Sequence, residues 1–112
     1  MNFDVTEERG VILIILNGEM VGGPDATALS EKLHDLITDN KKKIMLDMSE
    51  VRWMNSSGLG ILIGALNTIR KADGNLKLFG LTDKPRHLLK ITQLDKVFDI
   101  CQTKEEAIDQ FV

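Results

Sequence analysis

Two short apolar runs, the second of which includes one aspartate, constrain the fold of this chain more than any other feature of its sequence. The first is VILIIL, from Val11 to Leu16, and the second extends from Ile44 to Met48. Runs of this length and composition are typical of strands that are buried on both faces. Such strands occur mostly in parallel sheets that helices cover, so the sequence predicts an α/β fold.

The remaining elements alternate between strand and helix. Phe3 and Val5 alternate with polar residues, which predicts a strand near the edge of the sheet. Two further strands are expected at residues 76–79 and 97–101, and four helices at residues 24–37, 59–74, 82–91 and 103–111. With right-handed crossovers, this order predicts a single domain over residues 1–112, with a mixed, mostly parallel β-sheet of about five strands packed with about four helices.

Three helix starts carry specific signals. Pro24 suits the first position of a helix, because its missing N–H would have no partner there. Thr82 can cap the third helix with its hydroxyl. Thr103, followed three residues later by Glu106, matches a capping box for the closing helix.

The amino-acid composition excludes several classes of function. The chain is 43% hydrophobic and 28% charged, as expected of a soluble globular domain. Its net charge is -3, and its one dense basic cluster, residues 41–43, is interpreted as a solvated loop, so no nucleic-acid partner is expected. With one cysteine, Cys101, and two histidines, we expect no disulfide, no metal site and no cofactor.

The apolar runs also bear on location. They are far shorter than the roughly 20 residues that a membrane-spanning helix needs, so no membrane partner is expected. The opening sequence MNFDVTEERG does not resemble a secretory signal. Together these observations predict a cytoplasmic protein.

The stretch WMNSSGLG, residues 53–60, places two serines between a buried strand and a helix. In open α/β sheets, the loop that leaves the carboxyl end of a strand is the usual place for function. The first amides of a helix lack internal partners, and the helix dipole is positive there, so an anion is favoured beside Ser56 and Ser57. Gly58 and Gly60 would leave room for an approaching group. The site therefore suits a phosphate on a serine hydroxyl.

A structural role for the serines remains open at this point. Ser56 or Ser57 could simply cap the helix. One serine suffices for a cap, however, and we expect Trp53 and Met54 to be exposed beside the pair, where they would contact another protein. The alternative for Trp53 is packing within the core.

An enzymatic role for the serines lacks support in the sequence. NSSGLG does not match the nucleophile motif Gly-x-Ser-x-Gly, and no phosphate-binding loop of the type Gly-x-x-x-x-Gly-Lys is present. His34 and His87 are both expected on the surface, and nothing in the sequence indicates that either lies beside Ser56 as a base. We therefore predict no catalytic residue.

A family resemblance rests on four segments: DMS at residues 47–49, Val51, MNSSGLG at residues 54–60 and the turn GEM at residues 18–20. They resemble the signature of the STAS-domain anti-sigma factor antagonists, also called anti-anti-sigma factors. The order of strands and helices is similar to that of the family from about residue 2 to residue 112.

The resemblance implies regulation by partner switching. In that family, the unphosphorylated antagonist binds an anti-sigma factor that is also a serine kinase, and this frees the sigma factor. Phosphorylation of the motif serine ends the binding, and a serine phosphatase restores it. For this chain, the resemblance implies that Ser56 is the phosphoacceptor and that Ser57 caps the helix. The implied partner-binding residues are Met20, Val21, Gly22, Met54, Asn55, Ser57, Gly58 and Leu59, on two loops that we expect to meet at neighbouring strand ends.

Two positions depart from the family pattern. Asn55 and Val21 occupy positions where many members have aspartate. This departure favours an alternative function, in which the chain is a STAS scaffold or adaptor subunit of a signalling or transport complex that is never phosphorylated.

Overall fold

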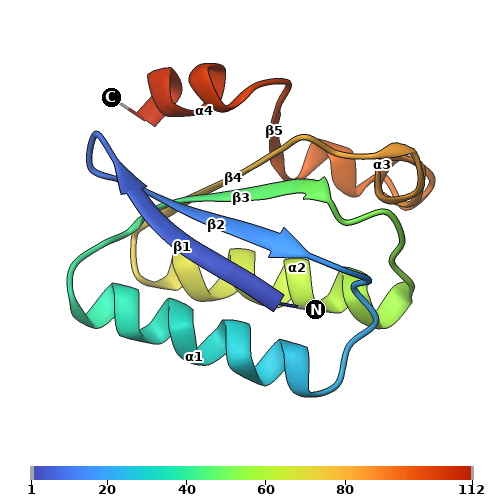
Figure 1. Cartoon of the computed structure of the whole chain (residues 1–112), viewed down its shortest axis with the longest axis horizontal. Helices are drawn as coiled ribbons and strands as arrows, with labels where there is room; N and C mark the ends of the chain where they lie inside the picture. Colours follow the sequence, from blue (N-terminus) through green and yellow to red (C-terminus); the bar gives the residue numbers. More distant parts are fainter. Residues whose placement is uncertain (1, 112) are drawn as a thin grey trace.

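The computed structural model of the chain describes residues 2–111, which form five strands, four α-helices and one short 3-10 helix (Figure 1). In chain order the elements are β1 (Asn2–Glu8), β2 (Val11–Asn17), α1 (Pro24–Thr38), β3 (Lys43–Glu50), α2 (Ser56–Lys71), β4 (Asn75–Phe79), α3 (Asp83–Ile91), the 3-10 helix (Leu94–Lys96), β5 (Asp99–Cys101) and α4 (Lys104–Phe111).

All five strands form one mixed sheet in the order β1-β2-β3-β4-β5. β1 pairs antiparallel with β2 and occupies an edge, while β2, β3, β4 and β5 are parallel to one another. The hairpin between β1 and β2 turns through Arg9 and Gly10, whose φ angles are both positive, at 53° and 79°. The predicted mixed, mostly parallel sheet and its edge strand are confirmed.

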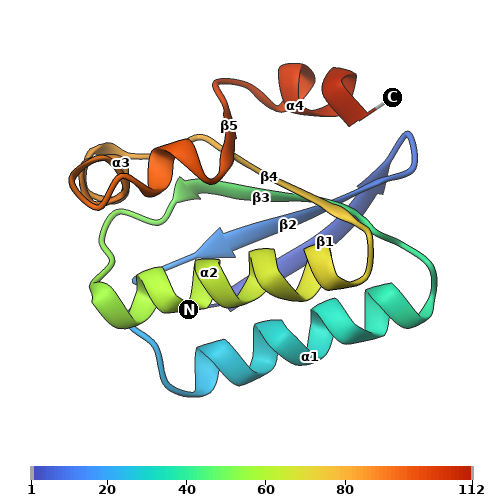
Figure 2. The same cartoon turned by 180° about the vertical axis from the view of Figure 1, so that it is seen from behind.

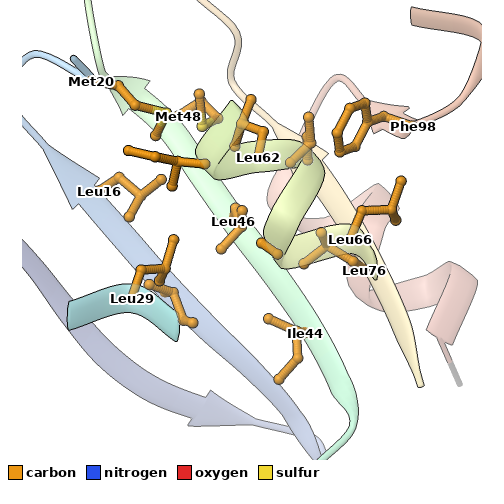
Figure 3. Close-up of a cluster of buried hydrophobic side chains, with 14 of the residues drawn as sticks. Leu16, Met20, Leu29, Ile44, Leu46, Met48, Leu62, Leu66, Leu76 and Phe98 are labelled. Carbon is orange, nitrogen blue, oxygen red and sulfur yellow. The ribbon is translucent and has the colours of Figure 1, made fainter. Parts of the chain in front are cut away.

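Helices cover both faces of the sheet. α1 and α2 lie side by side on one face, and α4 lies on the other (Figure 2). Alternate residues of β2 explain this layering: Ile12 and Ile14 belong to the core under α1 and α2, whereas Val11 and Leu13 belong to the core under α4. The continuous apolar run is therefore buried on both sides, as predicted. Figure 3 shows the larger core, in which β2, β3 and β4 meet α1 and α2.

The start of β5 and both ends of α2 differ from the prediction by two or three residues, and α2 begins at Ser56 rather than Leu59. The last strand begins at Asp99 rather than Val97, because the amides of Val97 and Phe98 both donate to the carbonyl of Leu94 in a tight turn. α2 ends at Lys71, three residues before Gly74.

Local signals at two helix starts are confirmed. Pro24 is the first residue of α1. At α4, the Thr103 hydroxyl accepts a hydrogen bond from the Glu106 amide at 3.1 Å, as a capping box requires. The Glu106 carboxylate in turn accepts from the amide of Gln102, at 3.2 Å, so the return bond reaches the residue before the cap.

Candidate functional site

Two loops meet at the carboxyl ends of β2 and β3, to the right in Figure 1. Met20, in the loop before α1, forms an isolated parallel β-bridge with Met54, in the loop before α2. The Met20 amide donates to the Trp53 carbonyl at 3.0 Å, and the Met20 carbonyl accepts from the Asn55 amide at 3.3 Å. The predicted meeting of the two loops is confirmed, and backbone hydrogen bonds hold it in place.

Two glycines allow this close approach. A Cβ atom on Gly58 would lie 1.9 Å from the carbonyl oxygen of Met20, and one on Gly22 would lie 2.8 Å from the Cβ of Ser57. Gly22 also has a φ of 98°, which other residues rarely adopt. Gly58 is therefore required by packing within the chain. Our expectation that it leaves room for an approaching group is wrong, because Met20 fills that space.

The amino end of α2 is capped by Asn55. Its side-chain oxygen accepts a hydrogen bond from the Gly58 amide at 2.9 Å. Ser56 and Ser57 are the first two residues of the helix, and both are exposed. The prediction that Ser57 is the cap is wrong, because α2 begins at Ser56, two residues earlier than a cap at Ser57 requires. Asn55 could have been found from the sequence, since asparagine is as good a cap as serine.

The serine pair retains the chemistry of an open helix end. The amides of Ser56 and Ser57 have no hydrogen-bond partner among residues 2–111. The first turn of α2 contains no acidic residue. Unpaired amides and the positive end of the helix dipole favour an anion on either hydroxyl.

Exposure divides the predicted partner-binding residues into two groups. Ser57 is exposed, as is Val21 at 40%, while Gly22 and Asn55 are partly buried. The buried group is Met20, Met54, Gly58 and Leu59. The accessible part of this surface therefore comes from both loops.

Trp53 and Met54, which are neighbours in the loop before α2, also differ in exposure. Trp53 is 42% exposed, as expected, but Met54 is only 5% exposed. The expectation that Met54 is exposed is wrong, because its bridge to Met20 places it in the larger core. The accessible residues of the two loops form one surface, which we call the serine face: Val21, Gly22, Trp53, Asn55, Ser56 and Ser57.

The loop before α2 is anchored at its start as well. The Thr82 hydroxyl donates to the carbonyl of Val51 at 2.5 Å. Thr82 stands at the cap position of α3 but makes no side-chain cap there, so the predicted role of its hydroxyl is wrong. Just upstream, the Asp47 carboxylate accepts hydrogen bonds from the amide and hydroxyl of Ser49 at 2.9 and 2.6 Å. The bond from Thr82 to Val51 ties the start of the loop that carries the serines to the start of α3.

The two histidines lie on other helices. His34 is exposed on α1, where its Nδ1 is 2.8 Å from the Ser30 carbonyl oxygen, and His87 is exposed on α3. Within residues 2–111, no group of three or more His, Cys, Asp and Glu side chains is arranged to hold a metal ion. In the same range, no helix has the length and apolarity needed to cross a membrane.

The structure is that of a small α/β domain in which an exposed hydroxyl pair lies at the start of a helix. Residues 2–107 match the family model described as the STAS domain, and the chain belongs to the STAS domain family. This match confirms the resemblance to the STAS-domain family that the sequence segments indicate.

Curated relatives are anti-sigma factor antagonists. The anti-sigma-B factor antagonist of Bacillus subtilis is 30% identical over 108 residues, which cover 96% of this chain and 97% of that protein. The anti-sigma-B factor antagonist of Listeria monocytogenes is 36% identical over 63 residues, which cover 56% of this chain. The matched segment spans 55% of the Listeria protein, about half of its length.

Solved structures share the fold. A candidate anti-sigma factor antagonist from Thermotoga maritima has a TM-score of 0.86 at 25% identity, with 96% of this chain and 92% of that chain covered. The phosphorylated form of SpoIIAA from Bacillus has a TM-score of 0.74 at 22% identity, with 99% of this chain and all of that chain covered. For the unphosphorylated form of SpoIIAA the TM-score is 0.73, at 21% identity and with coverages of 98% and 97%.

Proposed function

We propose that this chain is an anti-sigma factor antagonist of the cytoplasm that works by partner switching. The unphosphorylated chain binds an anti-sigma factor that is also a serine kinase, and a sigma factor is thereby freed. Phosphorylation of Ser56 ends the binding, and a serine phosphatase restores it. The observation that carries this proposal is the position of Ser56, exposed at the first residue of α2 beside an unpaired amide.

The fold tolerates a phosphate at this position. A phosphate adds a charge of about -1.5 to -2. At a helix amino end without neighbouring acids, an exposed anion gains about 0.3 to 1 kcal/mol. SpoIIAA, which shares this fold, has been solved in a phosphorylated and an unphosphorylated form, and the two resemble this chain to nearly the same extent.

Binding, by contrast, is sensitive to a phosphate on Ser56. Val21 and Trp53 are the large apolar side chains exposed on the serine face, so a partner docked there removes water from their surroundings. Desolvating a dianion in such an interface costs several kcal/mol unless a cation pairs with it, and each 1.4 kcal/mol weakens affinity about tenfold. The phosphate therefore acts on association rather than on folding.

The eight predicted partner-binding residues take different parts in this proposal. Val21, Gly22, Asn55 and Ser57 are accessible and contact the anti-sigma factor. The other four, Met20, Met54, Gly58 and Leu59, are buried, and they hold the two loops in the shape that the partner recognises.

Binding and modification are tested together with three variants. The purified chain is incubated with its candidate anti-sigma factor kinase and ATP, and its mass and its affinity for that protein are measured. We expect a gain of one phosphate on Ser56 and loss of the complex. Ser56→Ala binds without being switched off, and Ser56→Asp does not bind. Ser57→Ala, which identifies the acceptor, still gains one phosphate. Equal affinity of the modified and unmodified chains would contradict the proposal.

A scaffold function is favoured by a different observation. The first turn of α2 contains no acidic residue, Asn55 serves as a neutral cap, and Val21 is apolar, so the serine face carries no carboxylate of its own. If acids at these positions orient the hydroxyl or bind the kinase, this chain is an unphosphorylated adaptor. A stable complex with no gain in mass during the same incubation would support this second function.

A further inference from the structure

A groove separates α1 from α2 on the outer face of the helix pair, where Figure 2 shows them side by side. One hollow of about 190 Å³ lies between Leu29 and Leu33 of α1 and Gly60 and Gly64 of α2. A second hollow, of about 310 Å³, continues it toward the ends of both helices, and Thr68 lines both. The two hollows form one groove along the helix pair, which we call the α1–α2 groove.

Two glycines in this groove have no role in packing within the chain. Gly60 and Gly64 are exposed, one helical turn apart, and a Cβ atom on either would meet nothing within 4 Å. Glycine is unfavourable inside a helix, so its presence at two such positions requires a reason. Gly58 has one in the Met20 carbonyl, but Gly60 and Gly64 have none among residues 2–111. Bare backbone of this kind permits the close approach of another molecule.

The groove is continuous with the serine face. Gly60 lies one turn after Ser56 on the same helix, so a partner docked at Ser56 reaches the groove without a gap. No acidic residue lines either hollow, and Lys71 lines the far one. The occupant therefore has an apolar stripe and a negative charge near the end that meets Lys71.

The dimensions of the groove suit a helix. From Gly60 to Lys71, α2 rises about 16 Å, which corresponds to three turns. Both hollows are open to solvent rather than enclosed, which suits an elongated segment better than a small molecule. An amphipathic helix that places its apolar face in a groove is a common mode of peptide recognition.

We propose that the α1–α2 groove binds an amphipathic helix of the anti-sigma factor, as a second contact beside the serine face. The apolar stripe of that helix packs over Gly60 and Gly64, and an acidic residue near one end pairs with Lys71. This inference rests on the proposed function for the identity of the partner, but it concerns a different surface.

The test fills the groove without touching the serine face. Affinity for the purified anti-sigma factor is measured by calorimetry for Gly64→Leu and for Asn67→Leu, an exposed position on α2 that lines neither hollow. We expect Gly64→Leu to bind at least tenfold more weakly and Asn67→Leu to stay within twofold of the wild type. Lys71→Glu should weaken binding about threefold, and Lys96→Glu, an exposed control away from the groove, should not.

A milder variant guards against a folding defect in Gly64→Leu. Gly64→Ala adds one methyl group to open space, so its melting temperature should rise by about 2 to 4 °C. We expect the same variant to bind about threefold more weakly. Greater stability combined with weaker binding is a result that a purely structural glycine would not give.

The outcomes separate the two proposals. If Ser56→Asp loses binding while Gly64→Leu and Gly64→Ala bind like the wild type, the groove proposal is wrong and the proposed function stands. If Gly64→Leu loses binding while Ser56→Asp does not, the groove proposal stands, and the proposal that phosphorylation of Ser56 ends binding is wrong. Self-association of the chain alone in sedimentation, lost in Gly64→Leu, would assign the groove to a second copy and overturn the proposed occupant.

Discussion

The backbone of Gly58 lies directly against the carbonyl of Met20, so closely that a Cβ atom on Gly58 would be 1.9 Å from the Met20 oxygen. That same oxygen accepts the hydrogen bond from the Asn55 amide. One carbonyl thus fixes the first turn of α2 against the loop before α1. The serine face depends on this contact, because it is built from both loops.

Substitution of Gly58 tests this contact. Gly58→Ala should lower the free energy of unfolding by about 1 to 3 kcal/mol, since the added methyl group forces the backbone of one loop away from the other. Gly60→Ala, two residues later in the same helix, should instead raise it by about 0.5 to 1 kcal/mol, because its methyl group enters open space. Urea unfolding of the two variants measures both effects, and a stable Gly58→Ala chain would contradict the packing described for Met20.

The hydrogen bond by which Asn55 caps α2 leads to a second prediction. Asn55→Ala should lower the free energy of unfolding by about 1 kcal/mol, because the Gly58 amide loses its side-chain acceptor. Asn55→Asp keeps the acceptor and adds a charge that the helix dipole favours, so it should be at least as stable as the wild type at neutral pH. Ser57→Ala is the matched control and should stay within about 0.5 kcal/mol. If Ser57→Ala were the more damaging variant, the serine would be the cap after all.

Much of the fold could be predicted because burial on two faces leaves a direct mark on sequence. The run from Val11 to Leu16 has no polar position, and this alone separates a central strand from an edge strand such as the one around Phe3 and Val5. The helices follow from the spacing of their apolar residues. These signals are local, and the parallel sheet follows from their order.

The details of the site were less predictable because they depend on contacts between distant segments. Met54 looks exposed in sequence, beside Trp53, and only the bridge to Met20 places it in the core. Thr82 looks like a cap, yet its hydroxyl is taken by the carbonyl of Val51, 31 residues away. Neither partner can be read from the neighbouring sequence.

A charged side chain at position 56 should change the free energy of unfolding, and the sign of the charge should decide whether it rises or falls. Ser56→Asp places a negative charge in the first turn of α2, which has no acidic residue, so the free energy of unfolding should stay level or rise by up to about 1 kcal/mol. Ser56→Lys places a positive charge at the same end of the dipole and should lower it by a similar amount. Thermal unfolding at low and at high salt measures the difference, which salt should reduce. A strongly destabilised Ser56→Asp chain would undermine the view that a phosphate here acts on binding alone.

The buried thiol of Cys101 leads to a prediction about how the free energy of unfolding changes as the pH becomes alkaline. Burial under α4 raises the pKa of its thiol above the ordinary value of 9.0, and the nearby Glu106 carboxylate raises the pKa further. Unfolding restores the lower pKa, so the unfolded chain loses this proton first. The thiol's contribution to stability is complete below pH 9 and is lost as pH rises through the folded pKa.

Urea unfolding at pH 8 and pH 10 should therefore show a smaller decline in stability for Cys101→Ala than for the wild type. The raised pKa of Lys41, caused by its hydrogen bond to Glu7, is common to both chains and cancels in this comparison. Parallel declines in the two chains would show that the thiol titrates alike in the folded and unfolded states.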